Sequence, residues 1–263
     1  MLETVGIVDM GKSRNRNDDR ILINTLVWSE EKVRVFLDGD TNLLAVADGV
    51  GGGPGGDRAA EITLEAISEL AGKKPSAEAI WAAILCANRN VQAYGEENPS
   101  ASGLAATLSG TVVEAGEITT FNLGDSRVYR YRQGALFLLT KDHSAIQPLI
   151  DMGALTQEEA QSHKDKSIIT RYVGSDEKCV PDIVENVSFE EGDIILVCSD
   201  GLTDYVDRDY ISEVLSQNDI SEAADELVRA ANDAGGFDNI SVLLAKKTGG
   251  QIYEHGRQRN SAN

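Results

Sequence analysis

The sequence is poor in basic residues and in cysteine, and it has no long apolar run. Only 24 Lys and Arg stand against 43 Asp and Glu, which gives a formal net charge of −19. Nucleic acid and anionic membrane surfaces are bound through basic side chains, so both are poor partners for a chain this acidic. The longest apolar runs, such as IILVC at 194–198, are far shorter than the roughly 20 residues of a membrane-spanning helix.

The three cysteines, Cys86, Cys179 and Cys198, are odd in number and show no paired spacing. The first residues, MLETVGIVDMGK, contain neither the apolar core nor the charged start of a secretory signal. There is also no Cys/His spacing typical of a zinc site. We therefore expect a reduced, cytoplasmic protein.

The length and the hydrophobic content of 41% allow a sizeable core in one large domain or two small ones. No repeat with a period of 20–50 residues is present, and no low-complexity tract divides the chain before its polar end. We expect a single domain over residues 1–248 and a flexible tail over 249–263.

Periodicity predicts short strands interspersed with paired helices. Helices are expected from 57 to near 72, from 76 to about 94, near 207–217 and near 221–234, and alternating runs between them are typical of hairpins. Residues 144–180 look irregular and partly helical, with a capping box at Thr156 and Glu159. This order favours α+β layers over a regular βαβ succession.

Aspartates stand at the ends of four apolar strands. Asp48 ends LLAVAD, Asp125 ends ITTFNLGD, Asp200 ends DIILVCSD and Asp238 precedes NISVLLA. With Asp18, Asp19 and Asp204, seven carboxylates would converge at one edge of the sheets. Such a cluster repels itself unless cations are bound, and oxygen ligands suit Mg²⁺ or Mn²⁺. The alternative is that Asp is simply common in turns and at helix N-caps.

Two phosphate-binding patterns also occur, but their context argues against both. GIVDMGKS at 6–13 matches a P-loop, yet a turn and a strand follow it where a helix is required. GGGPGG at 51–56 matches a dinucleotide-binding loop, but βαβ alternation does not follow and Asp48 would stand close to the pyrophosphate.

Six motifs in the same order resemble the metal-dependent protein phosphatases of type 2C, of the compact bacterial kind. They are GKSRNRNDD at 11–19, ADGVGG at 47–52, LGDSR at 123–127, KDHS at 141–144, CSDGL at 198–202 and DNIS at 238–241. The resemblance runs from about Val8 to Leu244. It implies a β-sandwich of two antiparallel sheets flanked by helix pairs, with a small flap subdomain at about 144–180.

The resemblance also implies a ligand set. Asp48 matches the aspartate that bridges two metals, and the carbonyl of Gly49, where no side chain intervenes, matches a further ligand. Asp18 matches the acidic ligand of the second metal, where the family usually has Glu, and Asp19 matches a residue that holds metal-bound water. The remaining matches are Asp200 and Asp238 to the first metal, and Asp125 with Asp200 and Asp204 to a third.

The implied activity is the hydrolysis of phosphoserine and phosphothreonine in proteins. Two cations about 3.5–4 Å apart would hold a bridging hydroxide in line with phosphorus. Arg14 matches the arginine that clamps the phosphate through its planar fork, and its alternative is a solvated turn arginine or an ion pair with Asp18 or Asp19. Val50 stands where many eukaryotic members have a His that protonates the leaving group.

We therefore expect a phosphatase with two or three Mn²⁺ or Mg²⁺ ions, acting as a monomer on phosphorylated proteins and opposing a Ser/Thr kinase. Two alternatives remain open from the sequence. One is a catalytically weak or non-catalytic member that binds a phosphoprotein. The other is a phosphatase for a small phosphorylated metabolite.

Overall fold

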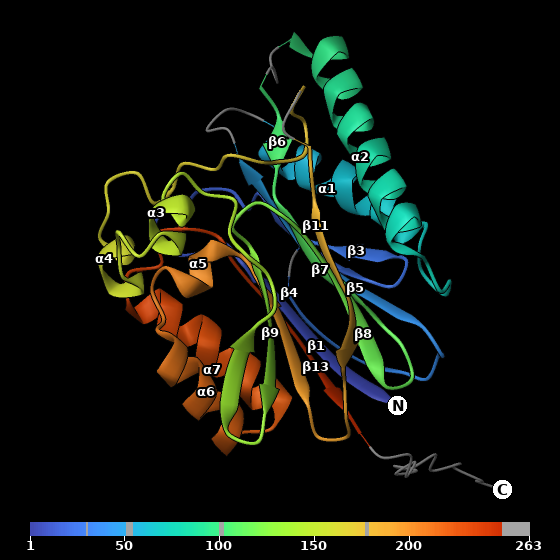
Figure 1. Ribbon diagram of the computed structural model, residues 1–263, viewed down its shortest axis with the longest axis vertical. Helices are drawn as coiled ribbons and strands as arrows, with labels where there is room; N and C mark the ends of the chain where they lie inside the picture. Colours follow the sequence, from blue (N-terminus) through green and yellow to red (C-terminus); the bar gives the residue numbers. More distant parts are fainter. Residues whose placement is uncertain (30, 51–54, 100–102, 177–178, 249–263) are drawn as a thin grey trace, which may run out of the picture.

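The structure is a computed structural model, and it describes residues 1–29, 31–50, 55–99, 103–176 and 179–248 (Figure 1). Within these ranges the strands form two antiparallel sheets. The six-stranded sheet has the order β10 (Ala135–Leu138), β9 (Arg127–Arg132), β12 (Ile194–Cys198), β13 (Ile240–Lys247), β1 (Leu2–Asp9) and β4 (Glu31–Leu37). The other sheet has the order β11 (Asp182–Ser188), β8 (Glu117–Leu123), β7 (Leu108–Val113), β5 (Asn42–Val50), β2 (Asp19–Ile23) and β3 (Leu26–Trp28), with β6 (Ala105–Ala106) paired to β5.

Apolar side chains divide the molecule into four layers. Residues of both sheets, among them Ile21 and Leu243, fill the space between the sheets. Separate apolar clusters join each outer sheet face to a helix pair, one on either side of the sandwich (Figure 1). The helices are α1 (Gly56–Ser68) and α2 (Ala77–Glu97) on one side, and α6 (Arg208–Gln217) and α7 (Ile220–Asp233) on the other.

Three of these helices begin at residues that satisfy free backbone amides. Ser76, Asp207 and Asp219 adopt extended backbone angles and accept hydrogen bonds from amides in the first turn of α2, α6 and α7. Such caps remove unsatisfied donors at a helix start and each contributes roughly 1 kcal/mol. The predicted starts near 76, 207 and 221 therefore lie within one residue of the observed helices.

Of the segment predicted at 144–180, the described residues 144–176 lie beside the end of the sandwich and contain α3 (Gln147–Asp151) and α4 (Gln157–Gln161). Thr156 and Glu159 form both hydrogen bonds of the capping box at the start of α4, as predicted. Two isolated bridges, Ser144 to Ile169 and Ala106 to Val173, connect the segment to itself and to β6. We call residues 144–176 of this segment the flap.

The predicted α+β sandwich with helix pairs is confirmed, and differences lie in details. β3, β4, β6 and the short α5 (Asp200–Thr203) were not predicted from the sequence. Asp48 does not end its strand, because β5 continues to Val50. The expected tail at 249–263 and most of the glycine-rich loop lie outside the described residues, and the domain limit at 248 stays a prediction.

The two ends of the described chain meet at one end of the sandwich. Thr248 donates a hydrogen bond from its backbone amide to the carbonyl of Met1, and β1 and β13 run antiparallel as direct neighbours. The opposite ends of these strands, at Asp9 and Ile240, lie where the aspartates gather. Among the described residues, no helix is long and apolar enough to cross a membrane.

Gly110 in β7 offers a test of the sheet packing. A Cβ atom there would lie 2.4 Å from Cζ of the fully buried Phe121 and 2.6 Å from the carbonyl oxygen of Leu44. We expect Gly110→Ala to lower the free energy of unfolding by about 1–3 kcal/mol, as overpacking of a core does. Chemical denaturation measures the loss. Gly39→Ala is the control, since its Cβ would meet nothing closer than 3.5 Å, and equal stability of both variants would contradict the packing argument.

Candidate active site

A cleft of about 650 Å³ opens at the end of the sandwich where the aspartates gather. Seven of the eight predicted metal-binding residues line it, and the predicted phosphate clamp Arg14 lies at its edge. The seven are Asp18, Asp48, Gly49, Asp125, Asp200, Asp204 and Asp238. The eighth, Asp19, is fully buried. The structure therefore brings the predicted set together.

Both sheets contribute carboxylates to this cleft. Asp19 and Asp48 are directly opposite each other on β2 and β5. Asp200 follows β12 and begins α5, while Asp238 precedes the neighbouring β13. Asp125 lies in the turn between β8 and β9, which belong to different sheets. Neither sheet alone would assemble the cluster.

A close contact of two glycines shapes the cleft wall beside Asp48. A Cβ atom at Gly49 would lie 2.1 Å from the carbonyl oxygen of Gly56, so no other residue fits without moving the backbone. The contact brings the start of α1 to Asp18, whose Oδ1 accepts a hydrogen bond from the amide of Asp57. An anionic group at a helix N-terminus is favoured by the exposed amides there.

Several carboxylate oxygens of the cluster lack a donor. The Oδ1 atoms of Asp19, Asp125 and Asp200 are buried and have no hydrogen-bond partner. Buried polar atoms are almost always satisfied, so such atoms call for an explanation. Hard divalent cations are suited to this all-oxygen donor set. The residues present therefore fit Mn²⁺ or Mg²⁺.

The pKa values of these carboxyl groups respond to burial and to one another. Burial, followed by the charges of the neighbouring aspartates, raises the pKa of Asp48 and of Asp200 well above the ordinary value. Burial raises the pKa of Asp19 to about 6, although hydrogen bonds from Ser199 and Ser241 oppose the shift. Burial and the charge of Asp142 raise the pKa of Asp125 to about 7. A nearby cation would favour the charged forms instead.

The carboxylates surround the cleft and do not converge on one point. Within the described parts of the chain, no three Asp, Glu, His or Cys side chains form a group that could already hold one ion. Three of the aspartates are instead turned to basic side chains at the rim. These are Asp238 with Arg14, Asp18 with Arg16, and Asp204 with Lys166.

Arg14 has a different partner from those considered in the sequence. Its Nη2 atom donates to Oδ2 of Asp238 at 2.8 Å, and its Nε atom donates to the carbonyl of Phe237 at 3.3 Å. The ion pair with Asp18 is made by Arg16, whose Nη2 atom lies 2.9 Å from Oδ2 of Asp18. The suggested pairing of Arg14 with Asp18 or Asp19 is thus not what the structure contains.

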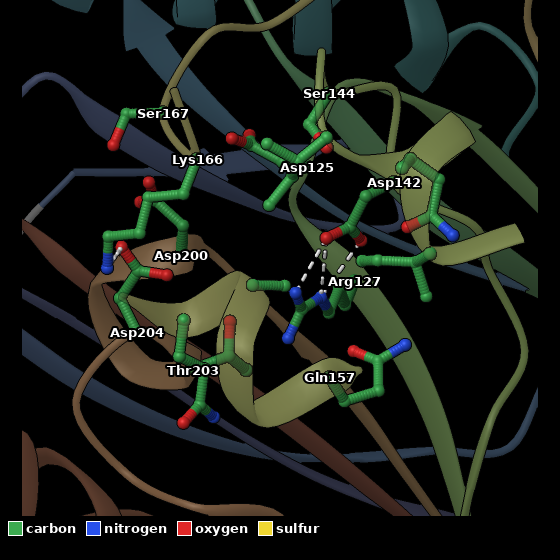
Figure 2. Close-up of a pocket in the computed structure, with 15 residues that line it drawn as sticks. Asp125, Arg127, Asp142, Ser144, Gln157, Lys166, Ser167, Asp200, Thr203 and Asp204 are labelled. Carbon is green, nitrogen blue, oxygen red and sulfur yellow. Dashed lines mark hydrogen bonds and ion pairs between the residues drawn. The ribbon is translucent and has the colours of Figure 1, made fainter. Parts of the chain in front are cut away.

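The flap reaches the cleft through Lys166 (Figure 2). Its Nζ atom lies 2.7 Å from Oδ2 of Asp204 and 5.9 Å from the centre of the Tyr205 ring. Arg127, which lines the same pocket as Lys166, forms a bidentate pair with Asp142 at the base of the flap. Neither Lys166 nor Arg127 was predicted from the sequence to have a role in the site. Arg127 lies within the LGDSR motif, but nothing in the sequence around Lys166 indicates its partner.

The sequence matches a family model described as Protein phosphatase 2C over residues 28–244. It is 33% identical over 249 residues to the serine/threonine phosphatase stp of Listeria monocytogenes, a match that covers 91% of this chain and 93% of the relative. It is 34% identical over 206 residues to the serine/threonine protein phosphatase PstP of Mycobacterium tuberculosis. That match covers 77% of this chain but only 40% of PstP, so the chain spans less than half of the length of this relative.

The fold is similar to solved structures with the same kind of name. The serine/threonine phosphatase of S. agalactiae has a TM-score of 0.81 at 30% identity, over 94% of this chain and 100% of that chain. The catalytic domain of PstP in complex with two manganese ions has a TM-score of 0.76 at 29% identity, over 95% of this chain and 100% of that chain. These likenesses agree with the arrangement of sheets and helices described above.

The raised pKa values predict how pH affects stability in EDTA. Since the pKa values of Asp19 and Asp125 rise from 3.8 to about 6 and about 7, the folded protein binds more protons than the unfolded chain between about pH 4 and 7. This contribution to stability is present at low pH and is lost as pH rises through that window. We expect Mn²⁺ to raise the Tm more at pH 7.5 than at pH 5, by several degrees, where 1 kcal/mol corresponds to about 2–4 °C.

Thermal melting of Asp125→Asn provides the specific comparison. The neutral amide removes the titration of Asp125, so the Tm in EDTA should fall less between pH 5 and 7.5 than in the wild type. The exposed Asp233, at the end of α7, gives the control variant Asp233→Asn. An unchanged pH profile in Asp125→Asn would show that this buried carboxyl does not govern the effect.

Proposed function

The chain belongs to the protein phosphatase 2C family, and on this premise we propose that it is a metal-dependent phosphatase for phosphoserine and phosphothreonine in proteins. One observation carries the proposal. Six carboxylates line one cleft and a seventh, that of Asp19, is buried beside it, and three of the seven have buried oxygen atoms without a donor. This is a costly arrangement for a protein that binds no cation.

The ligand assignment follows the family resemblance, and it is supported by the position of these residues in or beside the cleft. Asp48 would be shared by two ions and the carbonyl of Gly49 would be a further ligand, with Asp200 and Asp238 on the first ion and Asp18 on the second. Asp19 would hold a water next to Asp48. When bound, two divalent cations supply a water activated for attack on phosphorus and neutralise charge on the phosphate. The manganese ions bound to PstP support this choice of metal.

A third ion is proposed between Asp125, Asp200 and Asp204. These three carboxylates line a small pocket that lies beneath the flap (Figure 2). Asp125 and Asp200 each have a buried oxygen without a donor there. Asp204 is the exception, because Lys166 already supplies a positive charge to it. We therefore expect the third ion to bind more weakly than the other two.

Arg14 is proposed to bind the phosphate group of the substrate. Its side chain is half exposed at the cleft edge, and two of its five N–H groups are used by Asp238 and Phe237. A guanidinium held at one end by such bonds can present its other donors to two phosphate oxygens. Val50 lines the same cleft and has no proton to donate, so the leaving alkoxide is proposed to take its proton from water.

The substrates are proposed to be phosphorylated proteins, with the chain acting as a cytoplasmic monomer that opposes a Ser/Thr kinase. The names of the curated relatives support the protein substrate. No observation favours the two alternatives, a non-catalytic phosphoprotein binder or a phosphatase for small metabolites. The acidic residues at nearly all of the matched metal positions argue against the first of them.

Replacement of the central aspartate tests the activity. The wild type should hydrolyse a phosphothreonine peptide in Mn²⁺ and stop in EDTA, and Asp48→Asn should lower kcat by at least about 100-fold because the shared carboxylate is lost. Steady release of phosphate measures this. The control Asp233→Asn makes the same chemical change outside the cleft and should retain full activity. A folded wild type without metal-dependent turnover would contradict the proposal.

Arg14 is tested by separating substrate binding from metal binding. We expect Arg14→Ala to raise KM for the phosphopeptide about 10-fold or more, since charge-assisted hydrogen bonds to phosphate are lost. The affinity for Mn²⁺, measured by calorimetry, should change little. Lys12→Ala removes a neighbouring exposed cation that pairs with Asp233 and should leave KM unchanged. If Mn²⁺ affinity falls as much as substrate affinity, Arg14 serves mainly to hold Asp238.

A further inference from the structure

We propose that Ser199 and Ser241 are positioning residues for the phosphatase reaction, because together they fix the carboxyl group of Asp19 beside Asp48. The inference rests on the proposed function and deepens it. Neither serine lines the cleft. Both would act on the reaction only through Asp19, by holding one of its oxygen atoms and leaving the other for the site.

The three side chains form a fully buried group between the two sheets. The Oγ atoms of Ser199 and Ser241 each lie 2.8 Å from Oδ2 of Asp19. All three residues have no exposed surface. Asp19 begins β2 of the seven-stranded sheet, whereas Ser199 follows β12 and Ser241 lies in β13 of the six-stranded sheet. The group therefore links the two halves of the sandwich directly behind the cleft.

The direction of each hydrogen bond follows from the backbone. The amide of Ser241 donates to Oγ of Ser199 at 2.9 Å, and the amide of Ser199 donates to the carbonyl of Ser241 at 3.2 Å. Because Oγ of Ser199 already accepts a hydrogen bond, its own proton is available to Asp19. Ser241 donates to the same oxygen. Two donors occupy the two lone pairs of Oδ2.

This pattern distinguishes the two oxygen atoms of Asp19. Oδ2 is occupied, and Oδ1 is buried without a partner. Any rotation of the carboxyl group other than the half-turn that exchanges its two oxygen atoms would leave two buried hydroxyl groups without their acceptor, which costs roughly 1–3 kcal/mol for each group. The side chain is therefore held in one orientation. Since Asp48 is the cross-strand neighbour of Asp19, the free oxygen stays next to the residue that lines the cleft.

Residues that form hydrogen bonds to a metal ligand commonly affect metal binding almost as strongly as the ligand itself. Loss of such a partner typically lowers metal affinity or activity by 10-fold to 100-fold, because the ligand loses its orientation. A purely structural pair would behave differently, since its loss would lower stability and leave the kinetics unchanged. The two roles can therefore be separated by experiment.

The test compares Ser199→Ala and Ser241→Ala with the wild type in the full chain. We expect each variant to lower kcat for a phosphothreonine peptide by about 10-fold or more and to leave KM within about threefold, because Arg14 is not disturbed. Mn²⁺ affinity, measured by calorimetry without substrate, should fall by a similar factor. Ser241→Thr keeps the hydroxyl group and suits a strand, so it should recover most of both losses.

Thr63→Val is the matched control. It removes a fully buried hydroxyl group in α1 that donates to the carbonyl of Ala59 and takes no part in the hydrogen bonds to Asp19. It should lower the Tm and leave kcat and Mn²⁺ affinity unchanged. If Ser199→Ala fails to fold because the amide of Ser241 loses its acceptor, Ser241→Ala still tests the inference, since it keeps that bond.

Two results would overturn the inference while the proposed function stands. One is a wild type that turns over in Mn²⁺ beside serine variants that lose only stability, as Thr63→Val does. The other is a Ser241→Thr variant as impaired as Ser241→Ala. Failure of the proposed function has a different signature, namely a folded wild type without turnover. In that case the Mn²⁺ affinity of the serine variants still decides whether they position Asp19.

Discussion

Mutual repulsion of buried carboxylates is the constraint on which the rest of the site depends. The protein deals with it differently at the rim and in the interior. At the rim, Arg14, Arg16 and Lys166 each supply a positive charge to one aspartate. In the interior, burial raises the pKa of Asp48 and Asp200, and oxygens of Asp19, Asp125 and Asp200 have no donor. The interior carboxyl groups can therefore be stabilised either by bound protons or by bound cations, and this makes them suitable for a metal site.

Each sheet holds only part of the cluster of aspartates, so the packing of one sheet on the other brings these charges together. Asp19 and Asp48 are fixed by the register of β2 and β5, and Asp200 and Asp238 by that of β12 and β13. Apolar side chains join the sheets along most of their length. At the cleft the contact becomes polar, through the two serines that hold Asp19. The way the two sheets pack therefore also determines the geometry of the site.

Strand periodicity and the order of motifs predict the fold and the gathering of the seven aspartates, because both depend on local pattern. Partners across the sandwich could not be predicted in this way. Arg14 pairs with Asp238, more than 200 residues away, and Lys166 reaches Asp204 from the flap. Ser199 and Ser241 lie inside recognised motifs, but only the packing of the two sheets shows that both contact Asp19. The continuation of β5 past Asp48 likewise reflects pairing with β6, which is a tertiary effect.

The meeting of Met1 and Thr248 has a practical consequence for handling the protein. Both residues lie at the far ends of β1 and β13 from the cleft, and eight residues of strand span about 25 Å. A label or a surface linker attached to the first residue would therefore emerge on the side of the molecule facing away from the aspartates. Immobilised through that residue, the protein would present its cleft to the solution, so that the binding of a metal ion to the cleft could be followed on a sensor surface.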